Sequence, residues 1–179
     1  MIYRRLDISE IDRDLFRGFI RRQVVTDCWR REGGKNGKWV IKSDPFIDDW
    51  SEEDYAFLVS CLKNTLATGG FVYGAFEQNI LKGFVSVEPE LMDGGYLDLS
   101  SIHVSADMRG KGIGKVLFGA AADWAEERGA ERLYISSHSA VESQAFYKAM
   151  GCVEAERCFQ KHVEAEPYDR QLEYPIKKR

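Results

Sequence analysis

The sequence has no long apolar run. No stretch approaches the roughly 18 apolar residues of a membrane-spanning helix, and the first residues, MIYRRLDISEIDRD, lack the apolar segment of a secretory signal peptide. These absences argue against insertion into a membrane. They predict a chain that stays in the cytoplasm.

Cysteine and histidine are scarce. The 179 residues include four cysteines, without a Cys-x-x-Cys pair, and three histidines. Their spacing does not suggest a zinc site. We therefore expect no metal, and mostly free thiols in a reducing compartment.

An excess of positive charge is also lacking. The formal net charge is -4, which gives no reason to expect nucleic acid or an anionic membrane as a partner. A mild acidic excess suits a cationic substrate such as an amine. It is equally the usual balance of a cytoplasmic protein.

What is present suffices for a folded core. Hydrophobic residues make up 44% and charged residues 30% of the chain, as in an ordinary soluble domain, so we expect a single domain over residues 1–179. Apolar periodicity and capping residues predict helices at 11–20 (fraying towards 31), 51–66, 110–128 and 139–150. Strands are predicted at 2–6, 71–76, 80–87, 96–104, 132–136, 152–155 and 171–176. This order predicts an α/β (α+β) fold, with a mixed, mostly antiparallel sheet of about seven strands and helices on both faces.

The most informative segment is a glycine-rich turn between the strand at 96–104 and the next helix. It reads Arg109-Gly110-Lys111-Gly112-Ile113-Gly114-Lys115. Free N–H groups at the helix start, the helix dipole and glycines without side chains make an anion site, to which the basic residues add charge. The alternative is a turn whose glycines merely let strand and helix pack closely.

Spacing separates the phosphate binders that use such a turn. A Walker P-loop needs glycine where Arg109 stands and Ser or Thr where Val116 stands. A dinucleotide-binding turn needs a third glycine where Lys115 or Leu117 stands. The pattern that remains, Arg-x-x-Gly-x-Gly, resembles the pyrophosphate-binding signature of the GCN5-related N-acetyltransferase (GNAT) family.

A second segment carries the same resemblance. Residues 139–152 end in Phe146-Tyr147-Lys148-Ala149-Met150-Gly151-Cys152, which looks like the family's later helix with its Phe-Tyr-x-x-x-Gly ending. The resemblance is most specific over residues 96–152, and residues 1–68 match only in the order of elements. It implies the acyl-CoA N-acyltransferase fold, with acetyl-CoA as co-substrate. The implied reaction is acetyl transfer to a primary amine of a small molecule or of a protein.

The resemblance also implies which residues hold the co-substrate. The turn from Arg109 to Lys115 would bind the pyrophosphate, and the strand before it would pair with the pantetheine amides through the backbone of Ile102, His103 and Val104. Many members carry Asn six residues before the Phe and Ala three before it, where this chain has Ala140 and Ser143. Ser139 or Ser143 is then expected to supply the missing contact, with Phe146 beside them.

For catalysis the resemblance implies direct attack of a neutral amine on the thioester, with a backbone N–H stabilising the oxyanion. Tyr147 matches the family's acid, since a phenol with an ordinary pKa of about 10 is protonated at neutral pH. A core aromatic is its alternative role. As base we expect Asp98, a carboxylate in an apolar strand that should share a face with Ser100 and Ile102; an exposed edge residue is the alternative. Glu88 is the second candidate, followed by the histidines His103 and His138.

The acceptor site is the least defined. Aromatic and acidic residues in loops around 29–39 and 44–50 suit a pocket for a cationic amine, and equally an ordinary packed connection. The loop at 164–169 is another candidate border. Two other functions stay open: a non-catalytic CoA-binding sensor or regulatory module of the same fold, and a nucleotide-binding module. Dimers are common in the family, so a homodimer is a further expectation.

Overall fold

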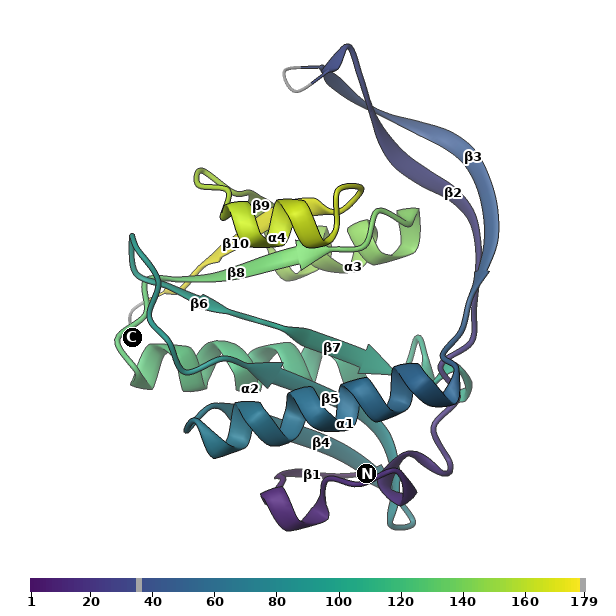
Figure 1. The fold of residues 1–179 in the computed structure, drawn as a ribbon, viewed down its shortest axis with the longest axis vertical. Helices are drawn as coiled ribbons and strands as arrows, with labels where there is room; N and C mark the ends of the chain where they lie inside the picture. Colours follow the sequence, from purple (N-terminus) through teal and green to yellow (C-terminus); the bar gives the residue numbers. More distant parts are fainter. Residues whose placement is uncertain (35–36, 178–179) are drawn as a thin grey trace. The chain divides into compact units, whose positions relative to one another are not determined.

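The computed structural model describes residues 1–34 and 37–177, which form two compact units (Figure 1). Unit 1 comprises Met1–Arg22, Asp49–Leu133 and the C-terminal residues from Pro175, and unit 2 comprises Gln23–Asp48 and Tyr134–Tyr174. Each unit is assembled from segments that are distant in the sequence. None of the helices in the described residues is long and apolar enough to cross a membrane.

Unit 1 is built on a four-stranded antiparallel sheet. Its strands are β1 (Ile2–Arg5), β4 (Phe71–Glu77), β5 (Ile80–Val87) and β7 (Ser101–Val104), and they pair in the order β1-β4-β5-β7. A short strand, β6 (Tyr96–Asp98), precedes β7. The segment is therefore not the continuous strand that we predicted at 96–104.

Two helices cover opposite faces of this sheet. On one face, α1 (Glu52–Ala67) packs through Leu58 and Leu62 into a core that includes Phe84 of β5. On the other face lies α2 (Ile113–Glu127), so close to Gly83 that an added Cβ would stand 3.0 Å from side-chain atoms of Ile113 and of Leu117. Since neighbouring strand residues point to opposite faces, Phe84 and Gly83 assign the two helices to the two faces.

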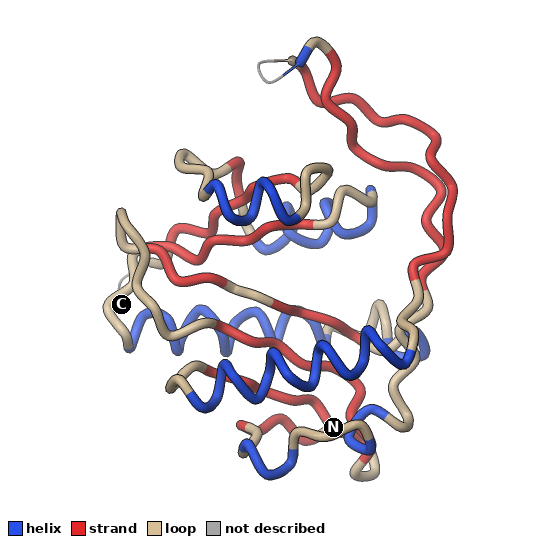
Figure 2. The backbone as a smooth tube through the Cα atoms, in the orientation of Figure 1, coloured by secondary structure: helices blue, strands red, loops and turns tan. Residues whose placement is uncertain are grey.

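Unit 2 contains a long two-stranded hairpin and a smaller α/β part, and Figure 2 shows the hairpin as two long strands. The hairpin consists of β2 (Gln23–Glu32) and β3 (Lys38–Asp48). The rest comprises β8 (Arg132–Ser137), whose larger part lies in this unit, α3 (Val141–Met150), β9 (Val153–Glu154), α4 (Gln160–Ala165) and β10 (Arg170–Pro175). Arg170 ties β10 to the hairpin, because its guanidinium lies 5.2 Å from the ring centre of Trp29 and 4.8 Å from that of Trp39.

The mixed α/β class with mostly antiparallel strands is confirmed, but two predictions for the first third of the chain are wrong. No helix forms at 11–20; the segment has 3-10 turns at Ile8–Glu10 and Asp14–Phe16, the first capped by Asp7 and Glu10. The apolar residues that suggested a helix serve the core instead: Ile11, Phe16 and Phe19 pack into it beside α1. The expected fraying and most of the expected loop at 29–39 are the strands β2 and β3, while Gly33, Gly34 and Gly37 lie outside both strands, in agreement with a glycine loop, and residues 35–36 lie outside the described part.

Candidate functional site

The glycine turn forms an open, donor-rich helix start. Gly110 and Gly112 have φ angles of 77° and 80°, the left-handed region that favours glycine, and Gly112 is the N-cap of α2. An added Cβ would meet nothing within 4 Å at either position. The first hydrogen bond within the helix runs from Val116 N–H to the Gly112 carbonyl at 3.3 Å. The N–H groups of residues 113–115 come before it in the chain, at the start of the helix, where N–H groups have no partner within the helix. This arrangement suits a phosphate group.

The segment that leads into the turn is fixed to the sheet by polar contacts. Lys82 of β5 forms a 2.7 Å ion pair with Asp107. This ion pair and a hydrogen bond from Ser105 lower the pKa of the Asp107 carboxyl. Arg109 donates to the carbonyl oxygens of Val104 (3.3 Å) and Arg21 (3.1 Å). Lys111 and Lys115 are exposed. The turn is therefore held in place, and the exposed Lys111 and Lys115 stand next to the helix start in the sequence.

Strand β7 leads to this turn along one edge of the sheet. Ser105 N–H donates to the Lys82 carbonyl at 2.9 Å, and His103 lies opposite Phe84 in the β5–β7 register. In an antiparallel pair the amides alternate between the two edges. The backbone groups of Ile102 and Val104 consequently point to the edge away from β5.

A β-bulge separates β7 from β6. Ser101 lies opposite Ser86 in the register, and Ser100 N–H also donates to the Ser86 carbonyl at 3.0 Å, so two residues face one. The bulge interrupts the alternation of side chains. Our expectation that Asp98, Ser100 and Ile102 share one face is therefore wrong, because Ser100 and Ser101 both line a pocket that Ile102 does not line.

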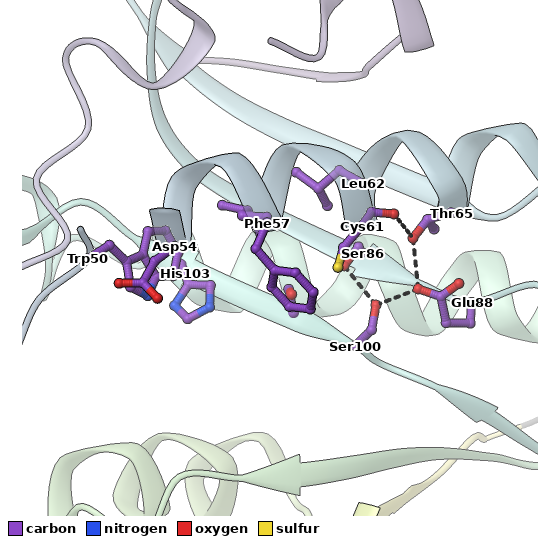
Figure 3. Close-up of a pocket in the computed structure, with 12 residues that line it drawn as sticks. Trp50, Asp54, Phe57, Cys61, Leu62, Thr65, Ser86, Glu88, Ser100 and His103 are labelled. Atoms are coloured by element: carbon purple, nitrogen blue, oxygen red, sulfur yellow. Dashed lines mark hydrogen bonds between the residues drawn. The ribbon is translucent and has the colours of Figure 1, made fainter. Parts of the chain in front are cut away.

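This pocket lies in unit 1 between α1 and the strands β5 and β7, and has a volume of about 320 Å³ (Figure 3). Helix α1 and the residue before its cap supply one wall and the two strands the other. The lining residues are Trp50, Asp54, Phe57, Leu58, Cys61, Leu62, Thr65, Ser86, Glu88, Ser100, Ser101 and His103.

Glu88 is held in the pocket by hydroxyl groups. Its Oε1 accepts hydrogen bonds from Thr65 at 2.7 Å and from Ser100 at 2.9 Å, and Ser100 lies 2.9 Å from the hydroxyl of Ser86. Figure 3 shows this chain of bonds at one end of the pocket. Hydrogen bonds fix the carboxylate, which leaves it oriented for a cationic or proton-donating partner.

The first base candidate, Asp98, lies elsewhere. Its side chain is buried, 5% exposed, and it is not among the pocket residues; its carbonyl accepts a 2.9 Å bond from Glu88 N–H. Asp54, which our sequence reasoning did not select, lines the pocket, and hydrogen bonds from Ser51 lower its pKa. His103 also lines it, its ring 4.8 Å from that of Trp50.

The remaining sequence candidates lie in unit 2. Tyr147 on α3 is 8% exposed, and burial raises its pKa above the ordinary value of a phenol. Phe146, half-buried, contacts it with ring centres 5.2 Å apart, and Ser143 on the same helix is half-buried too. Ser139 is 3% exposed, and its hydroxyl accepts a 2.5 Å hydrogen bond from Arg30 of the hairpin. Within this unit Ser139 therefore helps to pack the segment before α3 against the hairpin. His138 packs its ring against Phe46, 5.7 Å away.

Within residues 1–34 and 37–177, no group of three or more His, Cys, Asp or Glu side chains is placed to hold a metal ion. Sequence reasoning named Trp50 in a mixed aromatic and acidic segment, and Glu88 as second base. It missed Thr65, Ser86 and Asp54. A hydroxyl on the inner side of a helix, such as Thr65, was the available signal.

The sequence model of the acetyltransferase (GNAT) family matches residues 36–152. No curated protein sequence matches the chain.

Among solved structures, the chain is similar to a nourseothricin acetyltransferase (TM-score 0.73, 17% identity, 98% of each chain covered). It is also similar to a candidate streptothricin acetyltransferase from Bacillus anthracis in complex with acetyl coenzyme A (TM-score 0.66, 17% identity, 96% of this chain and 95% of that chain). A third is the PaiA N-acetyltransferase from Thermoplasma acidophilum in complex with coenzyme A (TM-score 0.59, 18% identity, 97% of this chain and 98% of that chain). At these identities the likeness establishes the fold.

Proposed function

Because the chain belongs to the acetyltransferase (GNAT) family, we propose that it transfers the acetyl group of acetyl-CoA to the nitrogen of an amine. The observation that carries the proposal is the open helix start of α2, where Gly110 and Gly112 leave the N–H groups of residues 113–115 accessible to a phosphate. We take residues 1–179 as one catalytic domain.

The residues present suit acetyl-CoA as a substrate. The pyrophosphate would accept hydrogen bonds from the N–H groups of the turn, and Arg109, Lys111 and Lys115 would add positive charge. The pantetheine arm would lie along the outer edge of β7, where Ile102 and Val104 present their backbone groups. Four strand residues span roughly 10 Å. An arm of that length or more brings the thioester to the bulge at Ser100 and Ser101, in the wall of the pocket.

The pocket then serves as the acceptor site. An aliphatic amine with an ordinary pKa near 10 arrives as an ammonium ion and must lose a proton before it can attack. A carboxylate takes this proton, and we assign that role to Glu88 in place of Asp98, because Glu88 lines the pocket.

The nitrogen lone pair forms the new N–C bond at the thioester carbonyl, and the C–S bond breaks to release a thiolate. The thiolate takes a proton from Tyr147, and the acylated nitrogen gives up its second proton to restore the phenol through solvent. One ammonium and one thioester thus yield one amide, one thiol and one proton. We propose Tyr147 as this acid, because it occupies the tyrosine position of the Phe-Tyr-x-x-x-Gly ending by which this helix resembles the family.

The solved structures that resemble this chain include acetyltransferases named for nourseothricin and streptothricin, which supports a small-molecule acceptor. The second candidate function is a CoA-binding regulatory module without catalysis. The hydroxyl-bound carboxylate of Glu88 in a pocket beside β7 favours the enzyme over the module.

Thermal unfolding with acetyl-CoA, coenzyme A, ATP and NAD tests the proposal. A ligand at about 100 times its Kd stabilises by roughly 2.7 kcal/mol, a shift of several degrees for a chain of this size. We expect a shift with both CoA forms, and then release of free thiol in the presence of amines. No shift with either, or a larger shift with ATP or NAD, would refute the co-substrate. A shift without thiol release from any amine or protein acceptor would favour the regulatory module.

A further inference from the structure

The acceptor pocket carries a carboxylate at each end. Asp54 and Thr65 lie eleven residues apart on α1, which corresponds to about 16 Å along the helix axis. Glu88 accepts a hydrogen bond from Thr65, so it lies at the other end of the pocket. Figure 3 shows this separation, with Asp54, Trp50 and His103 at one end and Glu88, Ser100 and Thr65 at the other.

The wall between the two carboxylates is largely apolar. Phe57, Leu58 and Leu62 of α1 line it, with Cys61 beside them. In the part of the chain that the structure describes, the residues that line the pocket include no Lys or Arg. Such a pocket favours a molecule with an apolar middle and positive ends.

At the Asp54 end, the carboxylate is the group that would bind a cation. Trp50 meets His103 edge to face with ring centres 4.8 Å apart, and the Arg21 guanidinium lies 5.0 Å from the centre of the Trp50 ring. These rings therefore wall the pocket, and Asp54 offers the site for a ligand ammonium at this end. Hydrogen bonds from Ser51 hold Asp54 in place and lower its pKa, so it is ionised at neutral pH. This end would bind an ammonium that stays protonated.

The Glu88 end is the reactive one. The bulge at Ser100 and Ser101 lies there, at the far end of β7 from the glycine turn, and Ser100 donates to Glu88. The two ends of the pocket are about 16 Å apart along α1. If an ammonium binds about 3 Å inside each end, roughly 10 Å separates the two nitrogens.

Building on the proposed function, we propose that the acceptor is an elongated small molecule with two amino groups about 10 Å apart, acetylated at the one beside Glu88 while Asp54 binds the other. This substrate class is a long-chain diamine, or an oligoamine that presents two amino groups at that spacing. Asp54 is then the residue that determines specificity.

Matched amines test this proposal in a thiol-release assay. The probes are 1,7-diaminoheptane, whose nitrogens can lie about 10 Å apart; heptylamine, which has one amino group; and 1,3-diaminopropane, which cannot reach both carboxylates. We expect kcat/KM for 1,7-diaminoheptane to exceed that for heptylamine by about tenfold or more, a factor that corresponds to one added charged contact. Two equivalent amino groups alone would give only twofold, and we expect no more than that from 1,3-diaminopropane.

Variants locate the effect. Asp54→Asn keeps an oxygen that can accept the capping bonds from Ser51, and it should lower kcat/KM for the diamine at least about fivefold more than kcat/KM for heptylamine, which removes the advantage of the diamine. Glu53→Gln removes the same charge from the same turn of α1 but lies outside the pocket, so it should keep the advantage. Melting temperatures of both variants check that the helix remains folded.

Three results would overturn the inference. One is a diamine advantage of twofold or less, and another is an equal loss for both amines in Asp54→Asn. The third result applies if acetyl-CoA shifts the melting temperature but no amine releases thiol. In that case 1,7-diaminoheptane is titrated into the CoA complex by calorimetry. The inference is overturned if the diamine does not bind, or if it binds equally well to Asp54→Asn. The failure of the proposed function is distinct, because it appears as the absence of any shift with acetyl-CoA.

Discussion

Thr65 of α1 donates its hydroxyl to Oε1 of Glu88 at 2.7 Å, and this bond joins the helix to the residue that directly follows β5. Ser100, in the bulge, donates to the same oxygen at 2.9 Å. Two segments far apart in the sequence, α1 and the bulge, thereby orient one carboxylate. The position of Glu88 in the pocket depends on these bonds.

Replacing Thr65 with valine tests this positioning. Thr65→Val keeps the shape but removes the bond to a charged partner, which we expect to cost about 1–2 kcal/mol of unfolding free energy. We expect kcat to fall several-fold while the KM for acetyl-CoA stays unchanged, and Thr65→Ser to restore most of kcat. Steady-state kinetics and urea unfolding measure both effects. Equal kcat for the valine and serine variants would show that the hydroxyl does not position Glu88.

The glycine turn makes a prediction about binding. Gly112→Asp places a side chain at a φ of 80° and a negative charge where we propose the pyrophosphate binds, so CoA affinity should fall by at least a hundredfold. Gly129→Asp is the matched control, because Gly129 has a φ of 78° and equally open surroundings just after the other end of α2. Both variants should lose about 1–2 kcal/mol of stability. Titration calorimetry with coenzyme A should detect an affinity loss in Gly112→Asp alone; a similar loss in both would remove the assignment.

Local signals explain which parts of the fold could be predicted. The strands at 71–76 and 80–87 and the helix after the glycine turn were correctly predicted, because alternation, a short turn and helical periodicity all act over a few residues. Gly151, expected to end its helix, has the left-handed φ of 92° that such an end requires. The family resemblance rests on these same local segments, and the family match confirms it.

The hairpin and the pocket required information that the sequence pattern does not contain. In β2 only Val25 and Cys28 are buried, so its side chains do not alternate in the way that predicts a strand, and pairing with β3 determines its structure. The bulge that brings Ser100 and Ser101 into one wall depends on the register with Ser86. The place of Thr65 on the inner side of α1 signals a buried hydroxyl, but the sequence pattern does not identify Glu88 as its partner before the chain folds.

Tyr147 allows a prediction about pH as well as rate. We expect Tyr147→Phe to lower kcat at least tenfold and to leave the Kd of coenzyme A within twofold, since the proposed role of the phenol is to protonate the leaving thiolate. Because burial raises the pKa of Tyr147, its ionisation should not reduce kcat as pH increases towards 10. A pH–rate profile and binding titrations measure both. Unchanged kcat in Tyr147→Phe would assign the residue to the core, where it packs against Phe146.

Asp169 of unit 2 should make stability depend on pH. Burial raises the pKa of this carboxyl to about 6, despite a hydrogen bond from Ser136. In the unfolded chain the pKa returns to about 3.9. Between pH 4 and 6 the folded protein therefore keeps a proton that the unfolded chain has lost, so Asp169 makes the free energy of unfolding fall as pH rises through that window.

Asp169→Asn should remove this dependence, because the amide is neutral at every pH and its oxygen can still accept the bond from Ser136. Two full pKa units correspond to nearly 3 kcal/mol. Since the side chain is only half-buried, we expect the variant to gain about 1–2 kcal/mol at pH 7 and almost nothing at pH 4. Urea unfolding at both pH values, with the exposed Asp93→Asn as control, measures the difference. A variant that gains nothing at pH 7 would show that Asp169 is ionised in the folded protein without cost, stabilised by more than Ser136.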